Sequence, residues 1–503
     1  MFSNCFSLTS LDLSSFETPN LLDMKNMFIG CRGLISIDMP KFDTTEVTTM
    51  ENTFYSCNSL KELNLKSFNT KNVRIMNSLF SGCYSLTSVD ISNFNTSEVT
   101  DMSYMFKSCY SLTSVDVSKF MTSKVNNMNG MFYNCSSLTE LDLSYFDTSH
   151  TTAIAGMFDS CRKIKKLNLK NFSIKNVEYL NSLFNECNSL ESLDLSSFDF
   201  SNNRITSISK LFNGCSSLTS LDLSRFRTGR VTTMSRLFAG CLSLTSIDVS
   251  KFDTSKVTQV YQMFDGCTSL TSIDLSNFNA NSFKDTSNMF RNCEKLISLD
   301  LSNFKETNNL GYMSGMFEGC KSLEYLNIIN LDTYEVKNMR NIFKGCENLK
   351  EIKFKFDTSK VTTMEHMFDS CISLTSIDLK KFNTASTKNF SYMFINCQKL
   401  EKLDLSNFIT NLITDMSFMF SGCSSLTEIN LNSFDTKSVT TMNSMFSSCS
   451  SLYNLDLSSF NTEKCKVFTN MFDKVGNLTV KVNATTSRNL IDAIKDYVII
   501  DYE

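Results

Sequence analysis

A cysteine that returns every 26 residues constrains this chain more than any other feature. The spacing changes only by two residues added before Cys215, one added before Cys320 and one lost before Cys371. The series comprises Cys5, Cys31, Cys57, Cys83, Cys109, Cys135, Cys161, Cys187, Cys215, Cys241, Cys267, Cys293, Cys320, Cys346, Cys371, Cys397, Cys423 and Cys449. A fixed period of this length is typical of repeat architectures, so length alone does not predict several ordinary domains.

Each repeat contains two hydrophobic patterns. With the first residue of the chain as position 1, the repeat reads M-F-x-x-C-x-S-L-T-S-L-D-L-S-x-F-D-T-S-x-V-T-x-M-x-x. Alternation around positions 10 to 14 predicts a short strand with positions 11 and 13 inward and 10, 12 and 14 outward. Later in the repeat, Val125, Met128, Met131, Phe132 and Cys135 recur at three and four residues, which predicts a short helical segment. Glycine at position 4 predicts a left-handed helix end.

A unit this small cannot bury its own apolar face, so the repeats must stack. We expect an α/β repeat, a curved leucine-rich-repeat solenoid with a parallel β-sheet on the concave face and short helical segments on the convex face. Residues 1–472 would form about eighteen repeats, starting in the middle of one. Residues 473–503 would form a C-terminal cap with a strand at 478–482, a helix at 490–497 and a closing apolar run at 498–500.

The consensus S-L-T-S-L-D-L-S-x-F-D-T-S-x-V-T-x-M-x-x-M-F-x-x-C resembles the BspA-type leucine-rich repeat over nearly the whole chain. The resemblance implies a relation to bacterial surface and lipid-anchored proteins, notably those of mycoplasmas. It implies adhesion or recognition at a cell surface or after secretion, and it carries no catalytic residues. The chain has no signal segment and no apolar run long enough to span a bilayer. A truncated start inside a repeat would explain the missing signal.

Residues that carry chemistry are scarce. The two histidines, His150 and His366, lie in distant repeats, and general acid–base chemistry usually draws on histidine, so we expect no enzyme and no cofactor. The cysteines form no C-x-x-C pairs for zinc, and one per repeat at an inward position predicts reduced, buried thiols. The net charge of −4 and the acidic outward face argue against nucleic-acid binding.

Position 12 forms an acidic column along the predicted strand face. Its aspartates are Asp12, Asp38, Asp90, Asp116, Asp142, Asp194, Asp222, Asp248, Asp274, Asp300, Asp378, Asp404 and Asp456, usually with serine at position 14. Stacked carboxylates repel, which predicts that some titrate above the reference value. A hydroxyl–carboxylate hydrogen-bond ladder, a shared duplication history and loose cation binding all remain open as explanations of the column.

The column is interrupted around Cys320 and Cys346, where an aromatic side chain and several lysines replace the usual residues. We expect a partner contact there, since tyrosine is favoured at binding hot spots and flanking charge excludes wrong partners. Its residues are Tyr325, Asn327, Lys350, Lys353, Lys355, Lys380 and Lys381, and one residue is deleted before Phe356. Drift in a redundant array is the alternative, because Arg162, Lys163, Lys165, Lys166 and Lys170 form a similar basic island.

These features favour a noncatalytic recognition surface for a protein or glycan partner, with no nucleic acid involved. The sequence gives no oligomeric state. Two other functions remain open, an intracellular scaffold for protein–protein interaction and a structural spacer in a surface coat. A signal peptide or lipid-attachment cysteine upstream would favour display outside the cell.

Overall fold

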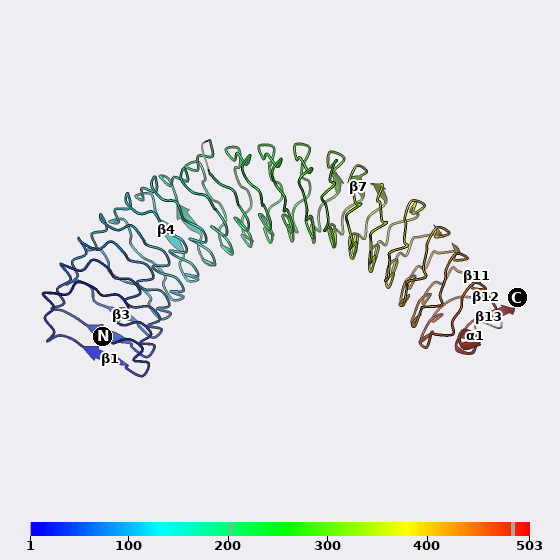
Figure 1. Ribbon diagram of the computed structural model, residues 1–503, viewed down its shortest axis with the longest axis horizontal. Coiled ribbons are helices and arrows are strands. Elements are labelled where there is room, and N and C mark those ends of the chain that lie inside the picture. Colours follow the sequence, from blue (N-terminus) through cyan, green and yellow to red (C-terminus); the bar gives the residue numbers. More distant parts are fainter. Residues whose placement is uncertain (1, 202–203, 484–487, 503) are drawn as a thin grey trace. The chain divides into compact units, whose positions relative to one another are not determined.

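The computed structural model describes residues 2–201, 204–483 and 488–502. The chain forms two compact units, Met1–Asp253 and Thr254–Glu503, and within each unit successive repeats stack as coils (Figure 1). We name each coil by its ladder cysteine. In the first unit the strands are β1 (Ser10–Asp12), β2 (Ser36–Asp38), β3 (Glu62–Leu63), β4 (Glu140–Asp142) and β5 (Lys166–Asn168).

The second unit contains the remaining strands and a helix. They are β6 (Ser298–Asp300), β7 (Tyr325–Ile328), β8 (Glu351–Phe354), β9 (Lys402–Asp404), β10 (Glu428–Asn430), β11 (Asn454–Asp456), β12 (Thr479–Val482), α1 (Arg488–Ile494) and β13 (Ile499–Tyr502). Strands β11, β12 and β13 form one parallel sheet, so the elements expected of the C-terminal cap are present. Their role as a cap stays a prediction.

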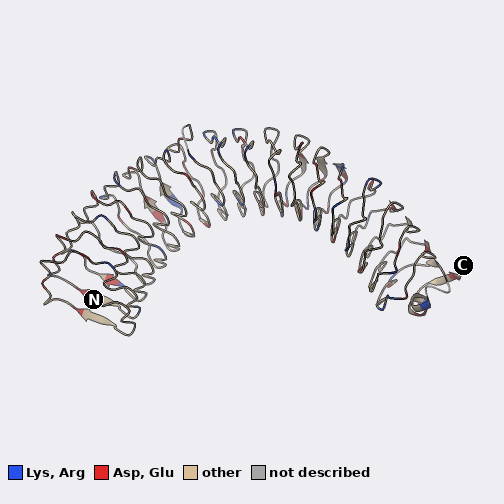
Figure 2. Ribbon diagram, viewed as in Figure 1, with Lys and Arg blue, Asp and Glu red and all other residues tan. Residues whose placement is uncertain are grey.

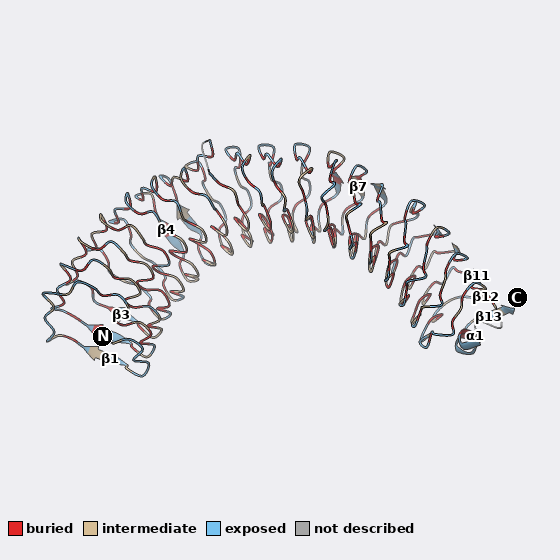
Figure 3. Ribbon diagram, in the orientation of Figure 1, coloured by how far each residue is buried: buried red, intermediate tan, exposed pale blue. Residues whose placement is uncertain are grey.

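The strand face follows the predicted alternation. In β1 and β2, Ser10 is the register partner of Ser36, and Asp12 is that of Asp38, in a parallel pair. Position 13 is buried in nearly every coil, whereas the position-12 side chains are mostly exposed. Figure 3 shows the buried segments recurring from coil to coil. The structure therefore confirms short parallel strands with one side chain per coil on each outward column.

The predicted helical segments are wrong. In the described residues the only helix is α1, and positions 21 to 5 instead form consecutive tight turns, which makes the fold a β-solenoid. Between residues 24 and 31, the N–H groups of even-numbered residues bond to carbonyls of the next coil at 2.7–3.1 Å. The N–H groups of residues 27, 29 and 31 bond three residues back at 3.1–3.3 Å. In an α-helix every N–H group bonds to the carbonyl four residues back along the chain. Here the N–H groups bond alternately to the next coil and three residues back, so the segment is not an α-helix.

Left-handed residues make these turns possible. Asn26 has φ 57° and Gly30 has φ 71°, and the same two positions are left-handed in coil after coil. The left-handed backbone expected at the position-4 glycines is thus confirmed, although it closes a turn and not a helix. The three- and four-residue spacing of buried side chains reflects these turns.

The threonine at position 18 links neighbouring coils, because its side-chain hydroxyl forms hydrogen bonds with the backbone of the next coil. The Thr44 hydroxyl donates to the carbonyl of Asn69 at 2.9 Å and accepts from the N–H of Asn69 at 2.7 Å. The side chain of Thr44 is fully buried. One hydroxyl thus satisfies both backbone groups of a residue in the next coil. The recurrence of threonine at position 18 is therefore explained by the stacking of the coils.

Aromatic rings and thiols fill the core between coils. Position-2 phenylalanines stack in sequence, as at Phe28 and Phe54, whose ring centroids lie 5.5 Å apart. The Cys57 thiol donates to the Phe28 carbonyl at 3.2 Å, and burial raises the pKa of that thiol to about 12. All of the cysteines are buried except for Cys5, which is exposed, so the predicted burial of the thiols is confirmed at every other position.

Candidate functional site

The position-12 column is explained first by local backbone geometry. Asp12 Oδ1 accepts a hydrogen bond from the N–H of Ser14 at 2.8 Å, and this bond recurs along the column. Asparagine serves equally, since the N–H of Lys66 donates to Asn64 Oδ1 at 3.2 Å. An oxygen on Cγ is therefore what the end of each strand requires, which explains why Asp and Asn exchange freely at this position.

The expectation of raised pKa values in this column is wrong where a shift is resolved. Hydrogen bonds from the backbone N–H and hydroxyl of the position-14 serine lower the pKa of Asp12, Asp90, Asp116, Asp194, Asp222, Asp248, Asp300 and Asp404. Hydrogen bonding to the charged form thus outweighs repulsion between coils. Among the residues that the structure describes, no group of three or more His, Cys, Asp or Glu side chains could hold a metal ion.

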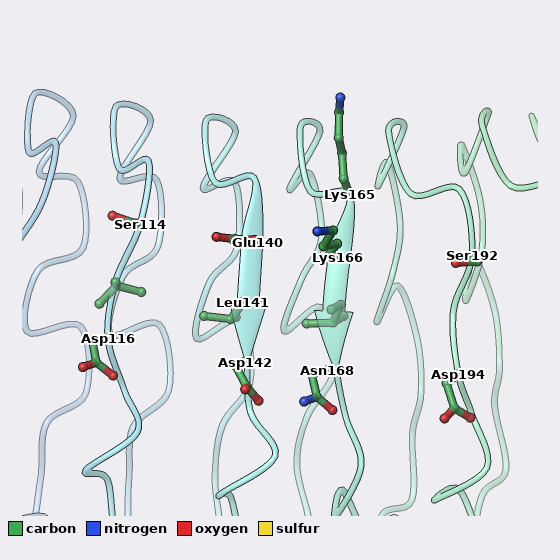
Figure 4. A pocket seen from close by; sticks show the side chains of 12 residues that line it. Ser114, Asp116, Glu140, Leu141, Asp142, Lys165, Lys166, Asn168, Ser192 and Asp194 are labelled. Carbon is green, nitrogen blue, oxygen red and sulfur yellow. The ribbon is translucent and has the colours of Figure 1, made fainter.

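The basic island of the first unit lies on the strand face beside β4 and β5. Figure 4 shows Asp116, Asp142, Asn168 and Asp194 in one row on successive coils, with Lys165 extending away from that row. A shallow recess of about 640 Å³ follows these strands. The acidic and basic strands lie side by side, as Figure 2 also shows. Position 13 of this coil, Leu169, is 2% exposed, so the core beneath the island is closed.

The structure brings the predicted contact residues of the second unit together on β7 and β8. The Lys353 ammonium lies 5.3 Å from the centroid of the Tyr325 ring. The Tyr325 hydroxyl, with the nearby Glu351 carboxylate, raises the pKa of Lys353. Lys350 forms an ion pair with Glu324 at 2.9 Å. A cation–π contact therefore orders the two strands' side chains at the centre of the predicted contact.

The other predicted residues lie around this centre. Asn327 Nδ2 donates to Asp300 Oδ2 at 3.2 Å, which ties β7 to the acidic column. Lys355 follows β8 directly, and Lys380 and Lys381 are exposed in the Cys371 coil. No described residue forms an ion pair with Lys355, Lys380 or Lys381. Lys355 and Lys381 thus carry charges without an ion-pair partner in the described chain, whereas the Lys380 charge contributes to the lowered pKa of Asp404.

A cleft beside β8 was not predicted. Position 15 is missing from the Cys346 coil, and Phe354 at position 13 is only half-buried, whereas the other described residues at position 13 are buried. The tight turn that elsewhere joins positions 13 and 16, as in the 2.9 Å bond from the N–H of Phe172 to the carbonyl of Leu169, has no counterpart between Phe356 and Phe354 in the described chain. The deletion therefore turns an inward side chain toward the surface.

The cleft has a volume of about 350 Å³ and lies between β8 and the Cys371 coil. Its apolar lining consists of Ile329, Ile352, Phe354, Phe356, Leu374, Ile377 and Phe382. Lys350, Lys355 and Lys381 also line it, with Glu351, Ser376 and Asp378. The sequence signal for this cleft is the single 25-residue spacing, between Cys346 and Cys371.

Five overlapping segments of the chain match the family described as "Mycoplasma protein of unknown function, DUF285". The matches cover residues 1–115, 111–217, 206–326, 311–408 and 399–496. The chain belongs to this family. Membership of the DUF285 family confirms the mycoplasma-type repeat that the consensus predicted, while the family description gives no activity. None of the curated proteins matches the chain.

This DUF285 chain is similar to several solved repeat proteins. A leucine-rich repeat protein from Bacteroides ovatus is 17% identical, with 91% of each chain covered and a TM-score of 0.36. One from Eubacterium ventriosum is 14% identical, covering 86% of this chain and 93% of that one, with a TM-score of 0.27. The functional domain of InlJ from Listeria monocytogenes, described as including a cysteine ladder, is 15% identical, covering 90% and 75%, with a TM-score of 0.23.

Among the described residues the one helix, α1, has seven residues. No helix in this part of the chain has the length and apolar character needed to cross a bilayer.

Proposed function

We propose that this protein is a noncatalytic recognition surface, displayed outside a microbial cell, that contacts its partner through the strand face of the Cys320 and Cys346 coils. One observation carries the proposal. Lys353, which replaces the usual aspartate of the position-12 column, lies against the ring of Tyr325 on the neighbouring strand, next to lysines without ion-pair partners in the described residues. An aromatic anchor with flanking charge is the usual composition of a binding hot spot.

The binding test compares the purified protein with the double variant Tyr325→Ala/Lys353→Asp. Surface plasmon resonance would be measured on immobilised extracellular-matrix proteins and on an oligosaccharide array. We expect the strongest interaction of the native protein to weaken about tenfold or more in the double variant. Lys166→Asp, in the basic island of the first unit, is the matched control and should leave binding unchanged. Equal binding by the native protein and the double variant would mean that the unusual residues of these two coils reflect sequence drift and do not form a binding site.

Display has its own test. Brief protease treatment of intact cells should release peptides of this chain, while a cytoplasmic marker protein stays intact. Release only after lysis would favour the intracellular scaffold.

A further inference from the structure

The cleft beside β8 differs from the rest of the strand face because its floor is apolar. Ile352 and Ile377 are half-buried, and the Phe354 ring meets Phe356 at a centroid distance of 5.1 Å. The Phe354 ring also meets the Phe382 ring edge-on at 5.9 Å. These contacts hold Phe354 in place while part of its surface faces the cleft. An ordered, partly exposed aromatic ring is a preformed contact for an apolar group.

Three lysines and only two acidic residues line the cleft, so its net charge is positive. Glu351 is paired with Lys353 at 3.5 Å, and Asp378 accepts a hydrogen bond from the N–H of Lys380 at 3.0 Å. Lys355 and Lys381 line the same cleft and have no ion-pair partner among the described residues. The acidic column continues beyond these coils at Asp300 and Asp404, so this is a local reversal of charge. An anionic partner would be repelled by the flanking face and attracted here.

The lining also distinguishes between classes of partner. Seven of the thirteen residues that line the cleft are isoleucine, leucine or phenylalanine, and Ser376 is the one uncharged polar residue among the other six. A sugar ring placed against these apolar side chains would lose hydrogen bonds to water without replacement, which is unfavourable for each buried hydroxyl. A bulky apolar side chain forms no hydrogen bonds to water and so would lose none on entering the cleft. The cleft therefore favours a protein segment over a glycan.

We infer that this cleft binds a protein segment in which one bulky apolar side chain, aromatic or leucine-like, is flanked by carboxylates. The apolar side chain enters between β8 and the Cys371 coil and packs on Phe354, and the carboxylates contact Lys355 and Lys381. The inference rests on the proposed recognition function and specifies the class of partner at that surface.

The experiment uses the full chain and fluorescein-labelled pentapeptides with the sequence Glu-Asp-X-Asp-Glu, in which X is Phe, Leu, Ala or Ser. Fluorescence anisotropy should give saturable binding for Phe and Leu. The Ala and Ser peptides should bind about tenfold more weakly, because they bury much less apolar surface. No saturable binding of the Phe peptide up to millimolar concentration would overturn the inference, and so would equal binding of the Ala peptide.

Two variants separate the cleft from general basic charge. Insertion of serine between Lys355 and Phe356 restores the missing position while keeping every lysine, so the Phe peptide should lose its advantage over the Ala peptide. Lys355→Glu/Lys381→Glu should abolish binding, whereas Lys165→Glu/Lys170→Glu, in the basic island of the first unit, should not. Circular dichroism and thermal unfolding confirm that each variant folds. Undiminished binding after the insertion would overturn the inference.

Oligosaccharides measured in parallel distinguish this inference from the proposed function. Saturable binding of a neutral or acidic oligosaccharide, lost in Tyr325→Ala/Lys353→Asp while no peptide binds, would overturn the peptide inference and support recognition by the same coils. Loss of peptide binding in the charge-reversal variant, with no oligosaccharide binding, supports both.

Discussion

The Cys161 and Cys346 coils carry similar lysines but differ in what lies beneath them. The Cys161 coil keeps 26 residues, and Leu169 under its basic island is buried. The Cys346 coil lacks position 15, and Phe354 at the equivalent place is half-buried beside a cleft of about 350 Å³. Substitution on an outward column thus changes charge alone, whereas a change of coil length rearranges the core. A binding site in such an array is better sought at irregular spacings than at unusual charges.

The largest expected effect on stability comes from deleting position 15 in the Cys161 coil, which has the regular length. Deletion of Asn171, at position 15 of the Cys161 coil, should lower the free energy of unfolding by about 4 kcal/mol. The change would expose Leu169 and remove the 2.6 Å hydrogen bond from Asn171 Nδ2 to the Ser144 carbonyl. Urea unfolding measures the loss. An unchanged free energy of unfolding would show that a regular coil tolerates a missing residue. The contrast drawn between the Cys161 and Cys346 coils would then be wrong.

Side-chain truncation should affect the two coils unequally. Leu169→Ala creates a cavity in a closed core and should cost about 3 kcal/mol. Phe354→Ala removes a larger side chain that is only half-buried, and we expect the smaller loss of stability there despite its size. Thermal and urea unfolding of both variants give the ranking. The reverse ranking would mean that Phe354 belongs to the core and is not held for contact.

The threonine column offers a smaller contrast. The Thr148 hydroxyl donates to the Ser173 carbonyl at 2.9 Å and accepts from the N–H of Ser173 at 2.6 Å. Thr333 donates to the carbonyl of Asp357 at 2.9 Å, but no return bond from Asp357 is present in the described chain. Thr148→Val should therefore cost about 2 kcal/mol and Thr333→Val about 1 kcal/mol. Equal losses in urea unfolding would mean that the missing return bond has no energetic consequence at Thr333.

The smallest effect concerns pH. Burial raises the pKa of Asp159 in the Cys161 coil, whereas at the same repeat position hydrogen bonds from His366 and Ser370, with the Lys344 charge, overcome burial and lower the pKa of Asp369. Ionised Asp159 thus opposes folding as pH rises above about 3.9, the unfolded value. Ionised Asp369 adds stability above that value, which is lost as pH falls through its lowered pKa.

The Asn variants test this difference in sign. At neutral pH, Asp159→Asn should raise the free energy of unfolding and Asp369→Asn should lower it, and both differences from the native protein should shrink below pH about 3. Urea titrations at the two pH values measure this. Changes of the same sign at neutral pH would contradict the assigned environments.

The sequence predicted the strands well and the rest of the coil less well. Alternation around Leu11 and Leu13 has a period of two, which only an extended backbone satisfies, so the strand and its inward positions followed directly. The spacing of Val125, Met128 and Phe132 fits a helix, but stacked turns with alternate N–H groups bonded to the next coil give the same spacing. Nothing in a single repeat reveals where those N–H groups point.

The candidate site was predicted in part. Replacement of column residues located Tyr325 and Lys353, and the structure places them in contact. The missing position was visible in the sequence, yet its effect on Phe354 depends on how Phe356 and Phe382 fill the neighbouring coils. The lowered pKa values of the Asp column likewise depend on hydrogen bonds from the N–H of position 14. The shift predicted from the sequence included only repulsion between the carboxylates and therefore missed these bonds.

The inter-coil bonds have a mechanical consequence. In the turns around residues 24–31, alternate N–H groups bond from one coil to the next, along the stacking direction, and the Thr44 hydroxyl also bonds to the next coil. A force that pulls the chain from one end of a unit therefore strains the bonds of the terminal coil before those of any other. Coils should detach one after another, and each 26-residue coil that detaches lengthens the chain by about 90 Å of extended backbone. Under tension, such a unit would extend in steps and would limit the force transmitted to whatever it holds.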